Sequence, residues 1–181
     1  MSRQSRVGAL ENAVVERVLE FDGKTTGSLE AACKAVGPDF TGFARLFELA
    51  ASEDTRLQIA ATWALRKLLK LGAEMTAAHC EAFIETATAQ TAWEAQLHIA
   101  QSVQFIGSED LNARRLADII TPWHKAKRPF LRAWTLDALC RLAHRDTGLK
   151  ETAATLLTKA GEDPTASVRA RARNLKKANL L

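Results

Sequence analysis

The apolar residues between Asp54 and Gly72 recur with the period of an α-helix. Steps of i, i+4, i+7, i+8 and i+11 place one stripe on one helix face, and this stripe contains Leu57, Ala61, Ala64, Leu65 and Leu68. Similar stripes predict further helices at residues 7–21, 28–36, 39–51, 75–89, 91–106, 108–121, 130–144, 147–160 and 167–180. Ser108, followed by two acidic residues, is the predicted start of its helix. No run alternates with the period of two typical of strands, so the pattern predicts an all-α fold.

Four of the predicted helices align as copies of one pattern. Their stripes open at intervals of 38, 36 and 37 residues, at Leu57, Ala95, Leu131 and Val168. Mostly small residues stand four and seven positions later, and larger ones stand eight and eleven positions later. Lys176 takes the eighth position of the last copy. A terminal repeat has no further neighbour to cover it, so this lysine predicts that the last copy closes the array.

These copies resemble the HEAT-repeat family of α-solenoids, whose helix pairs recur at a similar period. The closest match to the family pattern is Asp163-Pro164 with Val168-Arg169 and Ala172. Leu131-Arg132 with Ala138-Leu139 also fits, whereas Gln58 replaces the arginine in the copy that opens at Leu57. The copy at Ala95 lacks both the aspartate and the arginine.

The resemblance covers about residues 39–181 and implies a right-handed α-solenoid of four to five antiparallel helix pairs. The expected organisation is a single domain over residues 1–181, with a degenerate N-terminal pair at 7–37 and repeats at about 39–72, 74–107, 109–145 and 147–181. The alternative is an ordinary helical bundle, which the near-constant interval disfavours. Because solenoids serve many functions, the family alone does not identify one.

Composition narrows the classes of protein without naming a function. The 181 residues are 47% apolar and 25% charged, which is ordinary for a globular protein. No apolar run is long enough to span a bilayer, and the N-terminal segment lacks the apolar core of a secretory signal, so we expect a cytoplasmic protein that binds no membrane. The cysteines are widely spaced and odd in number, and packing is their expected role; they are Cys33, Cys80 and Cys140. We expect neither a metal nor a cofactor.

The charge is mildly basic and unevenly distributed. A net charge of +4 and a pI near 9.1 permit nucleic-acid binding without requiring it. Residues 73–106 contain no lysine or arginine, whereas the last predicted helix carries Arg169, Arg171, Arg173, Lys176 and Lys177. These five residues form either a patch for phosphates or an acidic protein, or the solvated face of a capping helix.

The second helix of each pair is expected to line a concave face, and the side chains off its buried stripe are candidate binding residues. They are Trp63, Arg66, His98, Gln101, Trp134, Asp137 and Arg141. A tryptophan off the stripe is costly to leave bare unless it packs or binds. The alternative is that both indoles wedge between adjacent repeats.

The expected function is a non-enzymatic scaffold or adaptor that binds a protein or peptide on the concave face, as a monomer or weak homo-oligomer. The alternative is a nucleic-acid-binding protein. Some HEAT-like solenoids are alkyl-base DNA glycosylases of the AlkD type, which use aromatic residues and an aspartate on that face, and Trp134 with Asp137 resembles this set. Otherwise no catalytic motif has a supporting context. Basic residues beside the tryptophans would favour nucleic acid, whereas an acidic or apolar face would favour a protein ligand.

Overall fold

The computed structural model describes residues 3–181, and every regular element in that range is helical. The α-helices are α1 (Arg3–Leu19), α2 (Gly27–Val36), α3 (Phe43–Ala50), α4 (Thr55–Lys70), α5 (Ala77–Ala89), α6 (Trp93–Ser102), α7 (Ala113–Ile120), α8 (Pro129–Arg145), α9 (Lys150–Ala160) and α10 (Ala166–Ala178). Short 3-10 helices join some of them: η1 (Gly37–Asp39), η2 (Val103–Phe105), η3 (Thr121–Lys125) and η4 (Thr147–Leu149). The prediction of an all-α fold is confirmed.

Helix α4 begins and ends at residues suited to these positions. The Asp54 carboxylate accepts a hydrogen bond of 2.8 Å from the backbone N–H of Arg56, which satisfies one of the free donors of the first turn. Beyond the last turn, Gly72 has a φ of 94°, a left-handed conformation that favours glycine. The stripe predicted between these two residues therefore forms one continuous helix.

Helix α7 starts later than the sequence pattern predicts. Ser108 does not open it, because its hydroxyl bonds the Asp110 carboxylate at 3.1 Å and accepts from the Asp110 backbone N–H at 3.2 Å, which forms a local turn. The cap is Asn112, whose side chain accepts from the N–H of Arg115 at 3.0 Å. Ser108 and Asn112 are both residues that can cap a helix, and the helix begins after Asn112, the one closer in sequence to the first apolar residues of α7.

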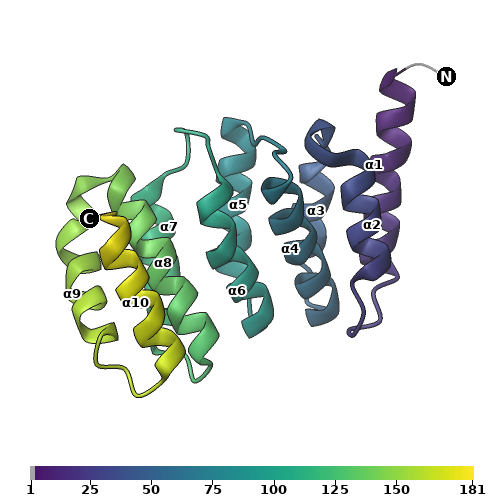
Figure 1. Cartoon of the computed structure of the whole chain (residues 1–181). Helices are drawn as coiled ribbons and strands as arrows, with labels where there is room; N and C mark the ends of the chain where they lie inside the picture. Colours follow the sequence, from purple (N-terminus) through teal and green to yellow (C-terminus); the bar gives the residue numbers. More distant parts are fainter. Residues whose placement is uncertain (1–2) are drawn as a thin grey trace.

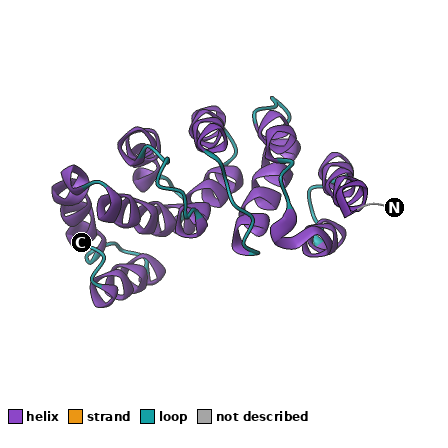
Figure 2. Ribbon diagram, turned by 90° about the horizontal axis from the view of Figure 1, so that it is seen from above, coloured by secondary structure: helices purple, strands orange, loops and turns teal. Residues whose placement is uncertain are grey.

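The helices pack in two rows. Helix α2 contacts α4, α4 contacts α6, α6 contacts α8, and α8 contacts α10; we call these five helices the even-helix row. Helices α3, α5 and α7 contact one another in sequence behind it, and Figure 1 shows the helices side by side from the N-terminal to the C-terminal end. Seen from above, the array of helices is bent, and its C-terminal end, which includes α10, curves toward the side on which the even-numbered helices lie (Figure 2).

The aligned stripe positions form the contacts between helices. At the fourth and seventh steps every copy is at most 4% exposed: Ala61, Ile99, Thr135, Ala172, Ala64, Ser102, Ala138 and Leu175. The opening residues are also buried, except that Leu57 is half-buried. Lys176 is exposed, as predicted for the last copy. Beyond the end of α10, Leu180 and Leu181 pack against a small cluster that includes Leu136 and Leu157.

One hydrogen bond recurs in four helices of the even-helix row. In α4, Gln58 donates from its side-chain amide to the Ser52 carbonyl at 2.9 Å. The equivalent bonds run from Gln96 to Gln90 at 3.1 Å, from Arg132 to Ala126 at 2.9 Å and from Arg169 to Asp163 at 2.6 Å. Each joins a side chain to the carbonyl six residues earlier, in the loop that leads into its own helix. The glutamines thus fill the role of the two arginines, because an amide is also a donor.

Candidate binding face on the even-numbered helices

The predicted surface residues of α4 and α6 form a first cluster, which we call the α4–α6 cluster: Trp63, Arg66 and His98. The guanidinium carbon of Arg66 lies 5.7 Å from the Trp63 ring centroid, within the range of a cation–π contact. His98 Nδ1 lies 3.1 Å from the Thr62 hydroxyl. All three side chains are half-buried.

His98 is neutral and has a defined tautomer. The Thr62 hydroxyl lies 2.7 Å from the Gln58 carbonyl and donates its proton there, so it accepts from the Nδ1–H of His98. Burial, and to a smaller extent the nearby charge of Arg66, lower the pKa of His98 to about 3. The imidazole is therefore a hydrogen-bond donor within the fold and carries no charge at neutral pH.

Arg66 has no polar partner among the described residues. Its Nε is buried and makes no hydrogen bond, and burial lowers the pKa of its guanidinium below the usual value. The negative charge of Glu30 on α2 acts on Arg66 from a distance. The Glu30 carboxylate is already bound by Lys67 at 2.7 Å and by Lys34 at 2.9 Å. Hydrogen bonds from these two lysines lower the pKa of Glu30 to about 2. Within residues 3–181 no carboxylate lies within ion-pair distance of Arg66.

The predicted residues of α8 meet α10 in a second cluster, the α8–α10 cluster: Trp134, Asp137, Arg141 and Arg171. Asp137 is only 2% exposed. It accepts from Arg141 Nε at 2.5 Å and from Arg171 at 3.2 Å, one arginine on each oxygen. The Arg171 guanidinium carbon lies 3.8 Å from the Trp134 ring centroid. Asp137 is thus an internal counter-ion for two arginines and does not face open solvent.

The basic residues of α10 divide between different environments. Arg171 belongs to the α8–α10 cluster, whereas Arg169 donates to the carbonyls of Asp163 and Pro164 in its own loop. The remaining three, Arg173, Lys176 and Lys177, are exposed. The five predicted basic residues therefore do not act as one unit.

Gln101 stands on α6 between the two clusters and is half-buried. Its backbone carbonyl accepts from the Gln104 side chain at 3.0 Å. Its own side-chain amide makes no hydrogen bond to any residue in the described part of the chain. This amide is therefore available to an incoming ligand.

The two predicted tryptophans are partly packed and partly exposed. Both Trp63 and Trp134 pack against the main core and both remain partly exposed. Further half-exposed apolar residues, which were not among the candidates, are Ile59 on α4 and Leu97 on α6. Phe130 on α8 is 62% exposed. Ile59 and Leu97 are 38 residues apart, and this interval, which separates α4 from α6 in the repeat, could have identified them.

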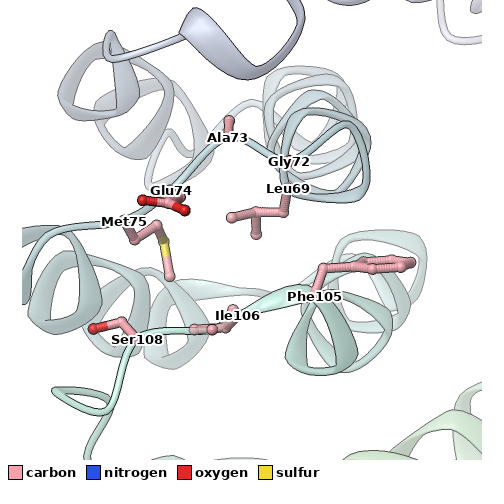
Figure 3. A pocket seen from close by; sticks show the side chains of 9 residues that line it. Leu69, Gly72, Ala73, Glu74, Met75, Phe105, Ile106 and Ser108 are labelled. Atoms are coloured by element: carbon pink, nitrogen blue, oxygen red, sulfur yellow. The ribbon is translucent and has the colours of Figure 1, made fainter.

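A separate cavity lies at the ends of α4 and η2. It has a volume of about 400 Å³ and is lined by residues of the loops at 72–75 and 105–108. Figure 3 shows Leu69 and Met75 projecting into the space between these loops, with the Glu74 carboxylate beside them. The cavity shares no lining residue with either cluster.

Neither a search for metal ligands and membrane-spanning helices nor comparison with known proteins assigns a further site. Among residues 3–181 no group of three or more histidine, cysteine or acidic side chains is placed to hold a metal. No helix in the same range combines the length and apolarity needed to cross a membrane. No model of a known protein family, no curated protein and no solved structure matches the chain.

Proposed function

We propose that this chain is a non-enzymatic scaffold or adaptor that binds a protein or peptide across the even-helix row. One observation carries the proposal: half-exposed aromatic and apolar side chains stand on three successive helices of that row. They are Trp63 and Ile59 on α4, Leu97 on α6 and Trp134 on α8. Protein interfaces are enriched in aromatic residues and arginine at their centres, and tryptophan is prominent among the residues whose truncation weakens binding most.

We also propose that the fold is a right-handed α-solenoid of HEAT-like helix pairs, and three features support this. The residues at the fourth and seventh stripe positions are buried in every copy, the hydrogen bond to the sixth preceding residue recurs in four helices, and each even-numbered helix contacts the next. In such an array each unit contacts only its neighbours. The row then presents an extended surface suited to a linear partner.

A glycosylase reaction receives little support from the geometry. Stabilising a developing sugar cation requires a carboxylate that faces the substrate. Both oxygens of Asp137 are occupied by arginines and the residue is 2% exposed. His98 is held neutral inside the fold. Neither residue is placed for catalysis.

Nucleic-acid binding without catalysis is the second candidate, because an arginine lies beside Trp63 and another beside Trp134, which is the arrangement expected to favour nucleic acid. Against it, Arg141 and Arg171 are already neutralised in part by Asp137. Electrostatic binding to nucleic acid relies on several phosphate contacts made by lysine and arginine. A protein partner is therefore the better fit to this face.

The proposal is tested by selecting peptides from a displayed random library on the full chain and measuring their Kd by calorimetry. In Trp63→Ala and Trp134→Ala the Kd should rise about 30-fold, as expected for loss of an interface hot spot of about 2 kcal/mol. Leu19→Ala is the matched control, since Leu19 is an exposed apolar residue outside the row, and its Kd should not change.

Selection of no peptide, or equal affinity in the tryptophan variants, would contradict the proposal. A 12-residue oligothymidine is measured in parallel by fluorescence anisotropy over a salt series. Micromolar binding that weakens steeply with salt would instead favour the nucleic-acid candidate.

A further inference from the structure

Building on the proposed protein-binding function, we infer that Arg66 is the anchor for a carboxylate of an acidic peptide segment. The peptide would lie across α4 and α6 with its acidic side chain at Arg66 and Trp63. The inference concerns the chemistry of the partner, whereas the proposed function concerns only the face that binds it.

The first argument is that Arg66 is the one half-buried arginine of residues 3–181 with neither a counter-ion nor a hydrogen-bond acceptor. Half-buried cations elsewhere in residues 3–181 have acceptors: Arg132 bonds Asp163, Arg169 bonds two carbonyls, and Arg141 and Arg171 share Asp137. The Nε–H of Arg66 is buried and has no acceptor among the described residues. Buried polar groups in folded proteins are nearly always satisfied. Because the Nε atom itself is closed to solvent, a ligand would reach the outer part of the half-buried guanidinium, where an anionic oxygen would supply the counter-ion that Arg66 lacks.

The second argument is the charge balance around the face. Glu30 is bound by two lysines and Asp137 by two arginines, so cations outnumber anions in both groups. Arg66 adds a further charge with no ion pair, and the neighbouring His98 adds none because it is neutral. These ion-pair groups and Arg66 together therefore carry a positive excess that an acidic ligand would complement.

The third argument selects a peptide over a polyphosphate. The half-buried side chains of α6, the helix between α4 and α8, include Leu97 and Gln101, which are apolar and neutral. They offer a hydrophobic contact and a free amide for a peptide backbone, but no charge for successive phosphates. An arginine fork binds a carboxylate through two parallel N–H···O bonds, and the Trp63 ring beside it supplies apolar contact area.

The spacing of the two clusters limits the length of the segment. Packed helices lie about 8–10 Å apart, so α4 and α8 are separated by about 16–20 Å. An extended chain covers this span with about six residues. A six-residue segment anchored at Arg66 therefore reaches Trp134.

The test uses the full chain and two labelled hexapeptides, one with three Glu-Leu repeats and one with three Gln-Leu repeats. By fluorescence anisotropy the Glu-Leu peptide should bind about tenfold or more tightly than the Gln-Leu peptide. Arg66→Gln should abolish this difference. Arg56→Gln should preserve it, because Arg56 lies on the same helix but is exposed and paired with Asp54.

Folding is checked separately with Arg66→Met, which keeps the apolar stem and removes the charge; its melting temperature should equal or exceed that of the parent. Equal affinity for the two peptides, or a charge preference that survives Arg66→Gln, would overturn the inference. Tighter Arg66-dependent binding of the oligothymidine than of the Glu-Leu peptide would also overturn it and assign the anion site to nucleic acid. If selected non-acidic peptides still bind through the tryptophans, the proposed function stands and only this inference fails.

Discussion

Replacing Asp137 by alanine tests whether this carboxylate is structural. Asp137 is 2% exposed, whereas the side chains of its partners Arg141 and Arg171 are 32% and 29% exposed. Removing one partner of a buried ion pair costs about 3–5 kcal/mol. Because both arginines keep some access to water, we expect the lower part of this range or slightly less, about 2–3 kcal/mol. For a chain of this length, that loss lowers the melting temperature by about 4–12 °C.

The free energy of unfolding is measured by urea titration and the melting temperature by circular dichroism. Asp118→Ala is the matched control, since Asp118 is an exposed aspartate on α7, and its effect should stay within about 0.5 kcal/mol. Asp137→Asn should cost less than Asp137→Ala, because the amide retains an acceptor for one arginine.

The double variant Asp137→Ala with Arg171→Ala gives the coupling energy, expected at about 1–3 kcal/mol. A loss below about 1 kcal/mol for Asp137→Ala, together with no coupling to Arg171, would refute the structural role. The carboxylate would then be free for chemistry, and the glycosylase alternative would regain its main residue.

Three further predictions concern other parts of the chain. Arg132→Ala removes a two-point ion pair to Asp163 and should increase amide hydrogen exchange in α10 selectively, as measured by mass spectrometry; uniform exchange along the chain would contradict it. The pKa of His98 is about 3 in the folded protein and about 6.5 in the unfolded chain. As the pH falls, the unfolded chain therefore binds a proton first, and the folded protein loses stability from about pH 6.5 downward. Melting temperatures should therefore fall less between pH 7 and 4.5 in His98→Gln than in the parent or in the exposed-site control His144→Gln. Burial raises the pKa of all three thiols, so a disulfide reagent at pH 8 should label none in the native protein and all three in urea, namely Cys33, Cys80 and Cys140; rapid native labelling would show that they are accessible.

The helices and their buried faces were predictable because apolar spacing alone determines which side of a helix is covered. Ala61, Ile99 and Ala172 are buried at the positions that the repeat assigns. The start of α7 was not predictable in the same way. Ser108 and Asn112 are both suitable caps, and the choice between them depends on how the loop packs.

The candidate face was only partly predictable from sequence. A position off the stripe was expected to be open, yet Asp137 is buried because α10 brings Arg171 over it. This contact joins residues 34 apart in the chain, and no local pattern records it. The equivalence of Gln58 and Gln96 to the two arginines was also missed, although all four are long side chains with N–H donors at one repeat position.

The hydrogen bonds that join neighbouring helices of the even-helix row lie at different ends of the helices. Gln58 also accepts from the N–H groups of Thr91 and Ala92, which ties α4 to the loop before α6, and Arg132 likewise ties α8 to Asp163 before α10. Between α6 and α8 the equivalent Gln96 bonds only its own loop in the described part of the chain. There Arg145, at the other end of α8, donates to the carbonyls of Ile106 and Ser108 beyond α6, and Arg128 lies over the Trp93 ring. The row is therefore pinned at alternate edges, so a ligand that spread the helices at one edge would have to break a different set of hydrogen bonds at each joint.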